Sequence, residues 1–343
     1  MITVKKGDGM GITIKELAEL SGYSPATISR VITNKGNVKE ETRLEIQKLL
    51  TKYHYKTNME GMRKSFYRER TILVLIGDMS NLFYQEQITR LSEAIREKDY
   101  ICMIGYTGDS IEAEESYVEI AVQEGYAGII FVNVRGGEQI AELINKSGIP
   151  VLFLNRTIPH ESFDSVCSDN YRGGYVATRY LIERGHRRIG HLAGSSYSHT
   201  ARERVRGYED AMEEHGLVVS PNSICYGNLD RSSGYKFGET IVKKGLGYTA
   251  VFCGNDLMAD GLVRAFREYG VRVPEDVSII CYDNTAISRD LGLTVVSSNP
   301  QKMGERAAEV LLSRIKNKEA DRQSILFSPV IIPGSSVLQR KEI

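Results

Sequence analysis

Hydrophobic residues near the start of the chain repeat at the spacing of an α-helix. Ile14, Leu17 and Ala18 fall on one helical face, which predicts a first helix that ends near Leu20. Gly22 follows at once, and glycine is typical of the tight turn after a helix. The pattern therefore predicts a short amphipathic helix followed by an abrupt turn.

A second short helix is predicted directly after this turn. Pro25 suits its first position, where the missing N–H of proline has no helical partner, and Ser24 suits the N-cap. The helix runs to about Thr33. A third helix follows, with an apolar stripe of Ile46, Leu49, Leu50 and Tyr53. Three such helices match the helix-turn-helix plan, although similar three-helix domains also occur in proteins that never contact DNA.

From residue 71 onward, short apolar runs alternate with longer amphipathic segments, which is typical of α/β folds. The runs are almost continuously apolar, as expected of parallel strands that helices cover on both faces. The sequence therefore predicts doubly wound parallel sheets. The expected strands span residues 71–76, 101–104, 127–132, 150–154, 189–193, 250–253, 277–282 and 293–297.

In the helix-turn-helix plan the second helix enters the major groove of DNA and offers its first turns to the bases. Arg30 is the residue best suited to read a base, because a guanidinium can bond guanine through two N–H groups. Its polar neighbours can contact phosphates or bases. The predicted DNA-binding residues are Pro25, Ala26, Thr27, Ser29, Arg30 and Asn34.

Charge is distributed unevenly along the chain. The whole sequence has 44 basic and 44 acidic residues, but residues 1–70 hold 14 of the former and 8 of the latter. This segment thus carries a charge of +6 and the remainder −6. A basic small domain is expected where only that domain meets phosphates, although an ordinary solvated helix face gives the same excess.

Polar side chains follow most of the predicted strands. In doubly wound sheets, ligands bind at the carboxyl ends of the strands, and amides, charges and aromatic rings together suit a polyhydroxylated or heterocyclic ligand. Individually, Asp256 could only cap a helix and Asn155 could only close a turn. The predicted effector-binding residues are Asn81, Phe83, Asn133, Asn155, Arg156, His199, Arg204, Asn255, Asp256 and Asp283.

Several classes of protein are disfavoured. The chain has no apolar run of about 20 residues and its N-terminus lacks the apolar core of a secretory signal, so we expect a cytoplasmic protein without a membrane span. We expect no catalytic residues, metal site or cofactor, because no P-loop or nucleophile elbow is present. Reduced, buried thiols are expected at Cys102, Cys167, Cys225, Cys253 and Cys281, which lack metal-ligand spacing.

Four motifs resemble the lactose repressor (LacI/GalR) family of bacterial transcription regulators, in particular its purine repressor branch. They are "TIKELAELSGYSPATISRVITNKGNVKEETR", "YLIERGHRRIGHLAG", "AVFCGNDLMADG" and "VPEDVSIICYDN", in the order and spacing of the family, and the match covers nearly everything from residue 12 onward. The resemblance implies a helix-turn-helix headpiece, a hinge, and an effector domain like that of periplasmic sugar-binding proteins, with two subdomains.

The resemblance also implies boundaries for these parts. A flexible lead-in occupies residues 1–11, the DNA-binding domain 12–57, the hinge 58–70 and the effector-binding and dimerisation domain 71–343. Its N-subdomain takes about 71–167 and 299–328, and its C-subdomain about 168–297 and 329–343. Position by position, the reading arginine of the family falls on Arg30, its effector arginine on Arg204 and its effector aspartate on Asp283.

The hinge departs from the family pattern. Family hinges fold on the operator and wedge a leucine into the minor groove, but the aligned position here is Lys64. Glu60 and Gly61 also occupy the usual alanine neighbourhood, and both disfavour a helix beside phosphates. Met62 or Phe66 is the alternative wedge.

The sequence therefore predicts a homodimeric transcription regulator, a repressor, that binds double-stranded operator DNA. A small-molecule effector in the cleft between subdomains controls its operator affinity, with a sugar favoured over a purine. Three alternatives remain open: a receptor-like sugar-binding protein whose basic domain contacts protein, a nucleotide-dependent enzyme, and a family member regulated by a phosphorylated protein partner.

Overall fold

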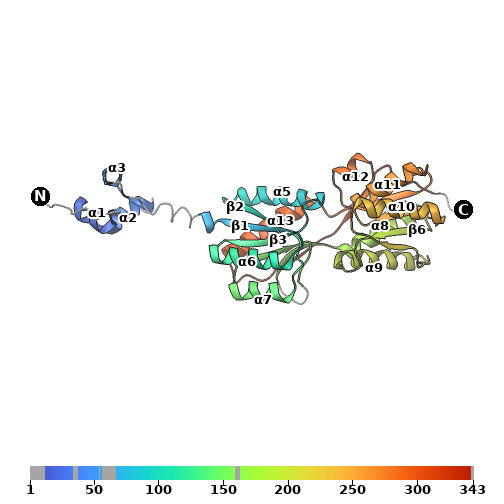
Figure 1. Cartoon of the computed structure of the whole chain (residues 1–343), viewed down its shortest axis with the longest axis horizontal. Helices are drawn as coiled ribbons and strands as arrows, with labels where there is room; N and C mark the ends of the chain where they lie inside the picture. The colour runs from blue at the N-terminus through green and yellow to red at the C-terminus, as the bar shows by residue number, and fades with distance from the viewer. Residues whose placement is uncertain (1–11, 34–37, 54, 56–66, 159–162, 341–343) are drawn as a thin grey trace. The chain divides into compact units, whose positions relative to one another are not determined.

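In the computed structural model, which describes residues 12–33, 38–53, 55, 67–158 and 163–340, the chain divides into two units, Met1–Arg68 and Glu69–Ile343 (Figure 1). The first unit consists of short helices and the second of two sheets with helices around them. The change from a helical to a βα hydrophobic pattern near residue 70 thus coincides with the boundary between the units.

The first unit contains the three predicted helices: α1 Ile14–Ser21, α2 Pro25–Thr33 and α3 Glu40–Lys52. Their apolar stripes meet in one small core, whose fully buried members are Leu17, Ile28, Val31 and Ile46. The stripe predicted for the third helix packs against this core through Leu49, Leu50 and Tyr53.

Local hydrogen bonds fix where these helices begin and end. Thr13 and Glu16 form a capping box at the start of α1, and Gly22 ends the helix with φ of 73°. The Ser24 hydroxyl accepts a hydrogen bond from the Thr27 N–H at 3.1 Å, just before Pro25 opens α2. The predicted N-cap and the predicted helix start are both confirmed.

The second unit contains two six-stranded sheets. The first has the strand order β11-β5-β4-β3-β1-β2, and the second has the order β12-β10-β9-β8-β6-β7. The strands of the first sheet are β1 Thr71–Ile76, β2 Ile101–Tyr106, β3 Gly128–Phe131, β4 Val151–Leu154, β5 Asp164–Ser168 and β11 Ser324–Phe327. Those of the second are β6 Ile189–Ala193, β7 Ile224–Tyr226, β8 Ala250–Cys253, β9 Ser278–Tyr282, β10 Thr294–Ser297 and β12 Val330–Ile332.

Helices cover both faces of each sheet, which is why the central strands are apolar throughout. Along β1, alternate residues enter two different cores: Val74 packs with α5 and α13, and Leu75 packs with α6 and α7. The helices are α5 Leu82–Arg96, α6 Ile111–Glu124, α7 Glu138–Ser147, α8 Asn170–Glu183, α9 His199–Glu214, α10 Arg231–Lys244, α11 Asp256–Glu268, α12 Ala286–Asp290 and α13 Pro300–Lys316. Late in the chain, α13 returns to the first sheet and packs on α5 (Figure 1).

The eight predicted strands are all present, and four further strands complete the sheets. These four strands, β5, β7, β11 and β12, are short, and β5 and β11 begin with polar residues. All strand pairings are parallel except that of β12, which runs antiparallel to β10 at one edge. No helix within the described ranges is long and apolar enough to cross a membrane.

Candidate functional sites: recognition helix and strand-end cluster

The second helix of the first unit presents an exposed surface at its start. Pro25, Ala26 and Arg30 are exposed, while Thr27 and Ser29 are partly buried. The Thr27 hydroxyl lies 2.9 Å from that of Ser24, so it contributes to the cap of α2. Arg30 therefore has the longest exposed side chain of the predicted set. The predicted contacts Asn34, Met62 and Lys64 lie outside the described residues.

In the second unit, charged side chains from the carboxyl ends of both sheets lie near the phenol of Tyr84. Burial raises the pKa of Tyr84, and the charges that act on it are those of Arg156, Asp283, Asp109 and Arg204. We call these five residues the strand-end cluster. Three of its members, Arg156, Arg204 and Asp283, belong to the predicted effector-binding set.

Packing and hydrogen bonds hold Arg204 in place on α9. Its Nε donates to Asn170 Oδ1 at 2.9 Å, and its Nη1 donates to the Gly254 carbonyl at 2.6 Å. The guanidinium carbon lies 3.5 Å from the ring centroid of Tyr282, a cation–π contact. A Cβ at Gly174 would lie 2.1 Å from the Arg204 carbonyl oxygen, so only glycine lets α8 approach α9 this closely.

Asp283 is the most buried charged member of the cluster, with 6% of its surface exposed. It follows β9 with φ of 76°, and its backbone N–H donates to the Val296 carbonyl at 2.9 Å. Burial raises the pKa of Asp283 to about 7; the Arg204 charge opposes this rise, and the Asp256 and Glu86 charges add to it. No hydrogen bond to its carboxylate occurs within the described residues, which leaves its oxygens available to a ligand.

Three predicted amides are instead bonded to the protein. Asn133 accepts from the Gly77 N–H at 2.9 Å and donates to Asp109, while Asn255 caps α11 by accepting from the Met258 N–H. Asn155 and Gln87 exchange two amide hydrogen bonds, of 2.8 and 2.9 Å. These amides fasten loops and helix ends in this structure.

The remaining predicted residues have different surroundings. Asn81 caps α5 by accepting from the Phe83 N–H at 3.0 Å, and the Phe83 ring is buried in the core beneath α5. Asp256 accepts from the Thr285 hydroxyl, and burial raises its pKa. His199 is exposed at the first position of α9.

Sequence reasoning overlooked Tyr84 and Gln87. The helical period of α5 holds the signal, because Phe83, Gln87, Leu91 and Ile95 share its buried face. That period assigns Phe83 to the core, and its neighbour Tyr84 packs against the same core from a half-buried position. The pairing of Gln87 with Asn155 joins positions 68 residues apart and has no local signal.

An ion pair links elements of the two sheets beside this cluster. Arg289 on α12 donates through Nη2 to Glu86 on α5 at 3.1 Å. A groove of about 370 Å³ lies at the same boundary and includes Glu86, Ala286 and Gln301 in its lining. In the described part of the chain, no group of three or more His, Cys, Asp or Glu side chains could hold a metal ion.

Both units of the chain are similar to domains of known proteins. Residues 13–58 match the model of bacterial regulatory proteins of the lacI family, and residues 178–337 match a periplasmic binding protein-like domain. The chain is 31% identical over 328 residues to the HTH-type transcriptional repressor PurR of Vibrio atlanticus, covering 95% of this chain and 98% of the relative. It is 32% identical over 329 residues to the PurR of Escherichia coli O1:K1, covering 95% and 96%.

Solved structures with similar folds cover the same length. The lac repressor dimer bound to operator and the anti-inducer ONPF has a TM-score of 0.77 at 22% identity, over 96% of this chain and 100% of that one. The complex of the transcriptional regulator CelR with cellobiose has a TM-score of 0.72 at 24% identity, over 95% and 99%. The chain thus belongs to the lacI family of bacterial regulatory proteins: it is a DNA-binding transcription regulator with a ligand-binding effector domain, and not an enzyme.

Proposed function

We propose that the protein is a homodimeric repressor whose operator affinity is controlled by a small polyhydroxylated molecule bound at the strand-end cluster. The observation that carries this proposal is that Arg204 stacks on the ring of Tyr282, the residue before the buried Asp283, and that both charges act on Tyr84. Arginine has five N–H donors, and two of those of Arg204 are bonded within the described residues. The remaining N–H donors of Arg204 can bond to hydroxyl groups of a ligand. Other hydroxyls of the same ligand can donate to the Asp283 carboxylate.

We favour a sugar or sugar derivative as the effector over a purine. The related CelR was solved with cellobiose, and a lacI family regulator from Enterococcus faecium was solved with ribose. Tyr84 offers a ring for the apolar face of such a ligand, and charged groups around it suit the hydroxyls. We assign the aromatic contact to Tyr84, which is half-buried, because Phe83 is buried in the core.

We propose that the second copy in the dimer covers the edge strand β2. Ile101, Met103, Ile104 and Tyr106 are between 38% and 56% exposed along this strand. An exposed apolar edge strand is prone to pair with another chain, and natural proteins usually cover or charge such an edge. A symmetric dimer would bury this edge and place two headpieces on one near-palindromic operator.

The parts proposed for this mechanism are the DNA-binding domain 12–57, the hinge 58–70 and the effector domain 71–343. In the effector domain, strands from 71–168 and 324–327 share one sheet, and strands from 189–297 and 330–332 share the other, which supports the proposed subdomains. An effector that changes their relative orientation changes operator affinity, and by linkage the operator changes effector affinity by the same factor.

The DNA-binding half of the proposal is tested at Arg30. An operator sequence is first selected from random duplexes with the wild-type protein, and binding to it is then compared with binding to scrambled DNA. Arg30→Ala should lose about 1–3 kcal/mol of discrimination while keeping salt-dependent non-specific binding. Lys48→Ala, which removes an exposed headpiece charge, should weaken both complexes alike. Unchanged discrimination in Arg30→Ala would contradict the assignment.

A further inference from the structure

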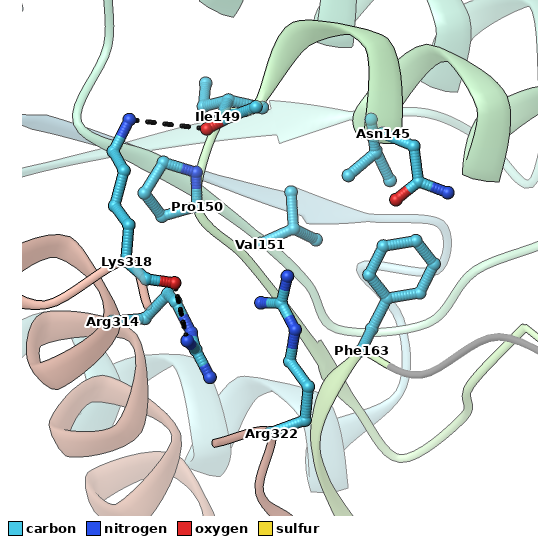
Figure 2. A pocket seen from close by; sticks show the side chains of 10 residues that line it. Asn145, Ile149, Pro150, Val151, Phe163, Arg314, Lys318 and Arg322 are labelled. Atoms are coloured by element: carbon cyan, nitrogen blue, oxygen red, sulfur yellow. Dashed lines mark hydrogen bonds between the residues drawn. The ribbon is translucent and has the colours of Figure 1, made fainter. Parts of the chain in front are cut away.

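A small cavity opens at the amino-terminal edge of the first sheet, where β4 and β5 begin (Figure 2). Its volume is about 100 Å³, and Ile144, Val151 and Phe163 form an apolar wall. Arg314, Lys318 and Arg322 also line it. Parallel strands have their carboxyl ends at the opposite edge, so this cavity is separate from the strand-end cluster.

Two of the three cations, Arg314 and Arg322, lie beside the same carboxylate, that of Asp164. Arg314 is 4% exposed and makes two bonds to Asp164, from Nε at 2.7 Å and from Nη2 at 3.0 Å. It also donates to the Lys318 carbonyl at 2.9 Å, which shapes the loop after α13. Because Asp164 is 1% exposed and already neutralised by Arg314, this pair supplies rigidity to the cavity and little net charge.

Two further cations, Lys318 and Arg322, line the cavity, and the acidic Glu319 and Asp321 also act on Arg314. The Arg322 side chain is 49% exposed, and its Nη1 lies 4.0 Å from Asp164 Oδ2, whose charge Arg314 already balances. Lys318 donates through Nζ to the Gly148 carbonyl at 3.3 Å. Gly148 is the C-cap of α7, so Lys318 offsets the partial negative charge of that helix end. The guanidinium of Arg322 therefore adds positive charge beside an apolar wall.

We propose that this cavity is a second small-molecule site, which binds the carboxylate or phosphate group of a small organic anion. The planar guanidinium of Arg322 can donate two parallel N–H bonds to such a group, and Lys318 adds a point charge. The volume of the cavity equals that of about three water molecules in the liquid. The anionic head therefore fits inside, and the apolar body of the ligand lies on Val151 and Phe163. The protein would then respond to two different metabolites at opposite edges of one sheet.

Isothermal titration of the full chain tests this proposal with three probes: inorganic phosphate, glucose 6-phosphate and benzoate. At least one probe should bind, and Arg322→Gln and Lys318→Gln should each weaken it about fivefold, the size expected for an exposed ion pair. Arg306→Gln is the matched control, because it removes a half-buried arginine of α13 whose partner is Glu309 and which does not line the cavity. Arg204→Ala should leave this binding intact, since Arg204 belongs to the other site.

The outcomes distinguish the two ligand classes and include results that would contradict the proposal. Binding of both phosphates without benzoate would identify a phosphate site, and the reverse would identify a carboxylate site; both support the proposal. Equal affinity in the wild type and both cavity variants would overturn the proposal, as would the absence of binding by all three probes. Loss of binding in Arg204→Ala would also overturn the proposal, because it would show that the anion binds at the strand-end cluster. Thermal melting of each variant confirms its folding, and none of these measurements depends on DNA binding.

Discussion

The carboxyl edges of the two sheets resemble each other in sequence but differ in how their polar groups are used. At the edge of the first sheet, the Asn133 and Asn155 amides are bonded to Gly77, Asp109, Gln87 and Val132. At the edge of the second sheet, Arg204 keeps donors available and the buried Asp283 carboxylate has no hydrogen bond within the described residues. The amides of the first edge brace loops, as does Asn255 at the second edge, whereas Arg204 and Asp283 keep the groups that we propose bind the effector.

This difference distinguishes polar residues that stabilise the fold from polar residues that are candidates for ligand binding. A buried amide with all its partners in the protein rigidifies its loop, and losing it costs folding stability. A buried carboxylate without a hydrogen-bond partner has a raised pKa, because burial disfavours its charged form, and is a candidate for ligand binding. Changes at the first edge should therefore alter stability, and changes at the second should alter the response to ligand and pH.

The largest effect is expected from the Asp283 charge. Its pKa of about 7 in the native state exceeds the value near 4 of an unfolded aspartate, so the native state holds more protons between these pH values. Its contribution to stability therefore falls as pH rises from about 4 to 7, by up to about 4 kcal/mol. Asp283→Asn should remove this dependence, as measured by urea unfolding from pH 4.5 to 8.

The comparison with Asp283→Asn is essential because two histidines act in the opposite direction. Burial lowers the pKa of His186 and of His191 to about 4, below the value near 6.5 of an unfolded histidine, so their contribution to stability is lost as pH falls from about 6.5 to about 4. Both histidines are present in the wild type and in the variant, so their effect cancels in the difference. Parallel pH profiles for the two proteins would show that Asp283 titrates near the ordinary value.

Arg204→Ala should abolish the response to the effector. A ligand at a hundred times its dissociation constant stabilises the native state by about 2.7 kcal/mol. Thermal shifts of the full chain against pentoses, hexoses, disaccharides, sugar phosphates and purines would identify this ligand, and the variant should lose the shift. Arg206→Ala is the control, because Arg206 lies on the same helix over the Tyr171 ring. A full shift in Arg204→Ala would remove Arg204 from the site.

Gln87→Leu should act on stability. It removes both hydrogen bonds between Gln87 and the partly buried Asn155 amide, which keeps only its bond to the Val132 carbonyl, at a cost of about 1–3 kcal/mol. Gln85→Leu changes the exposed neighbour on the same helix, which donates to the Met79 carbonyl, and should cost less. Urea unfolding at neutral pH measures both. A Gln87→Leu protein as stable as the wild type would contradict the bracing role of this pair.

Asn255→Ala should have the smallest effect, about 1 kcal/mol, through the lost cap of α11. Ser110→Ala removes the equivalent cap of α6 and serves as its match. If Asn255 only braces the second edge, effector affinity measured by calorimetry stays as in the wild type. A large loss of affinity with little loss of stability would instead move Asn255 into the binding site.

Much of the fold follows from local patterns. Pro25, Ser24 and Gly22 mark helix ends because their backbone requirements are satisfied by near neighbours in sequence. Apolar runs identify eight strands, of which seven are buried on both faces and one, β2, is an exposed edge strand. The strand β5 escapes this reasoning, because its first residue Asp164 is polar, and its burial depends on Arg314, which is 150 residues away.

The site divides in the same way. Motifs and short-range periodicity were enough to predict the family, the three helices of the headpiece and the strand ends where we propose that the effector binds. Long-range packing was needed to show which polar side chains at those ends are bonded to the protein. Tyr84 rather than Phe83 faces the charges, and Asn155 is paired with Gln87, because partners distant in the chain determine hydrogen bonding and burial.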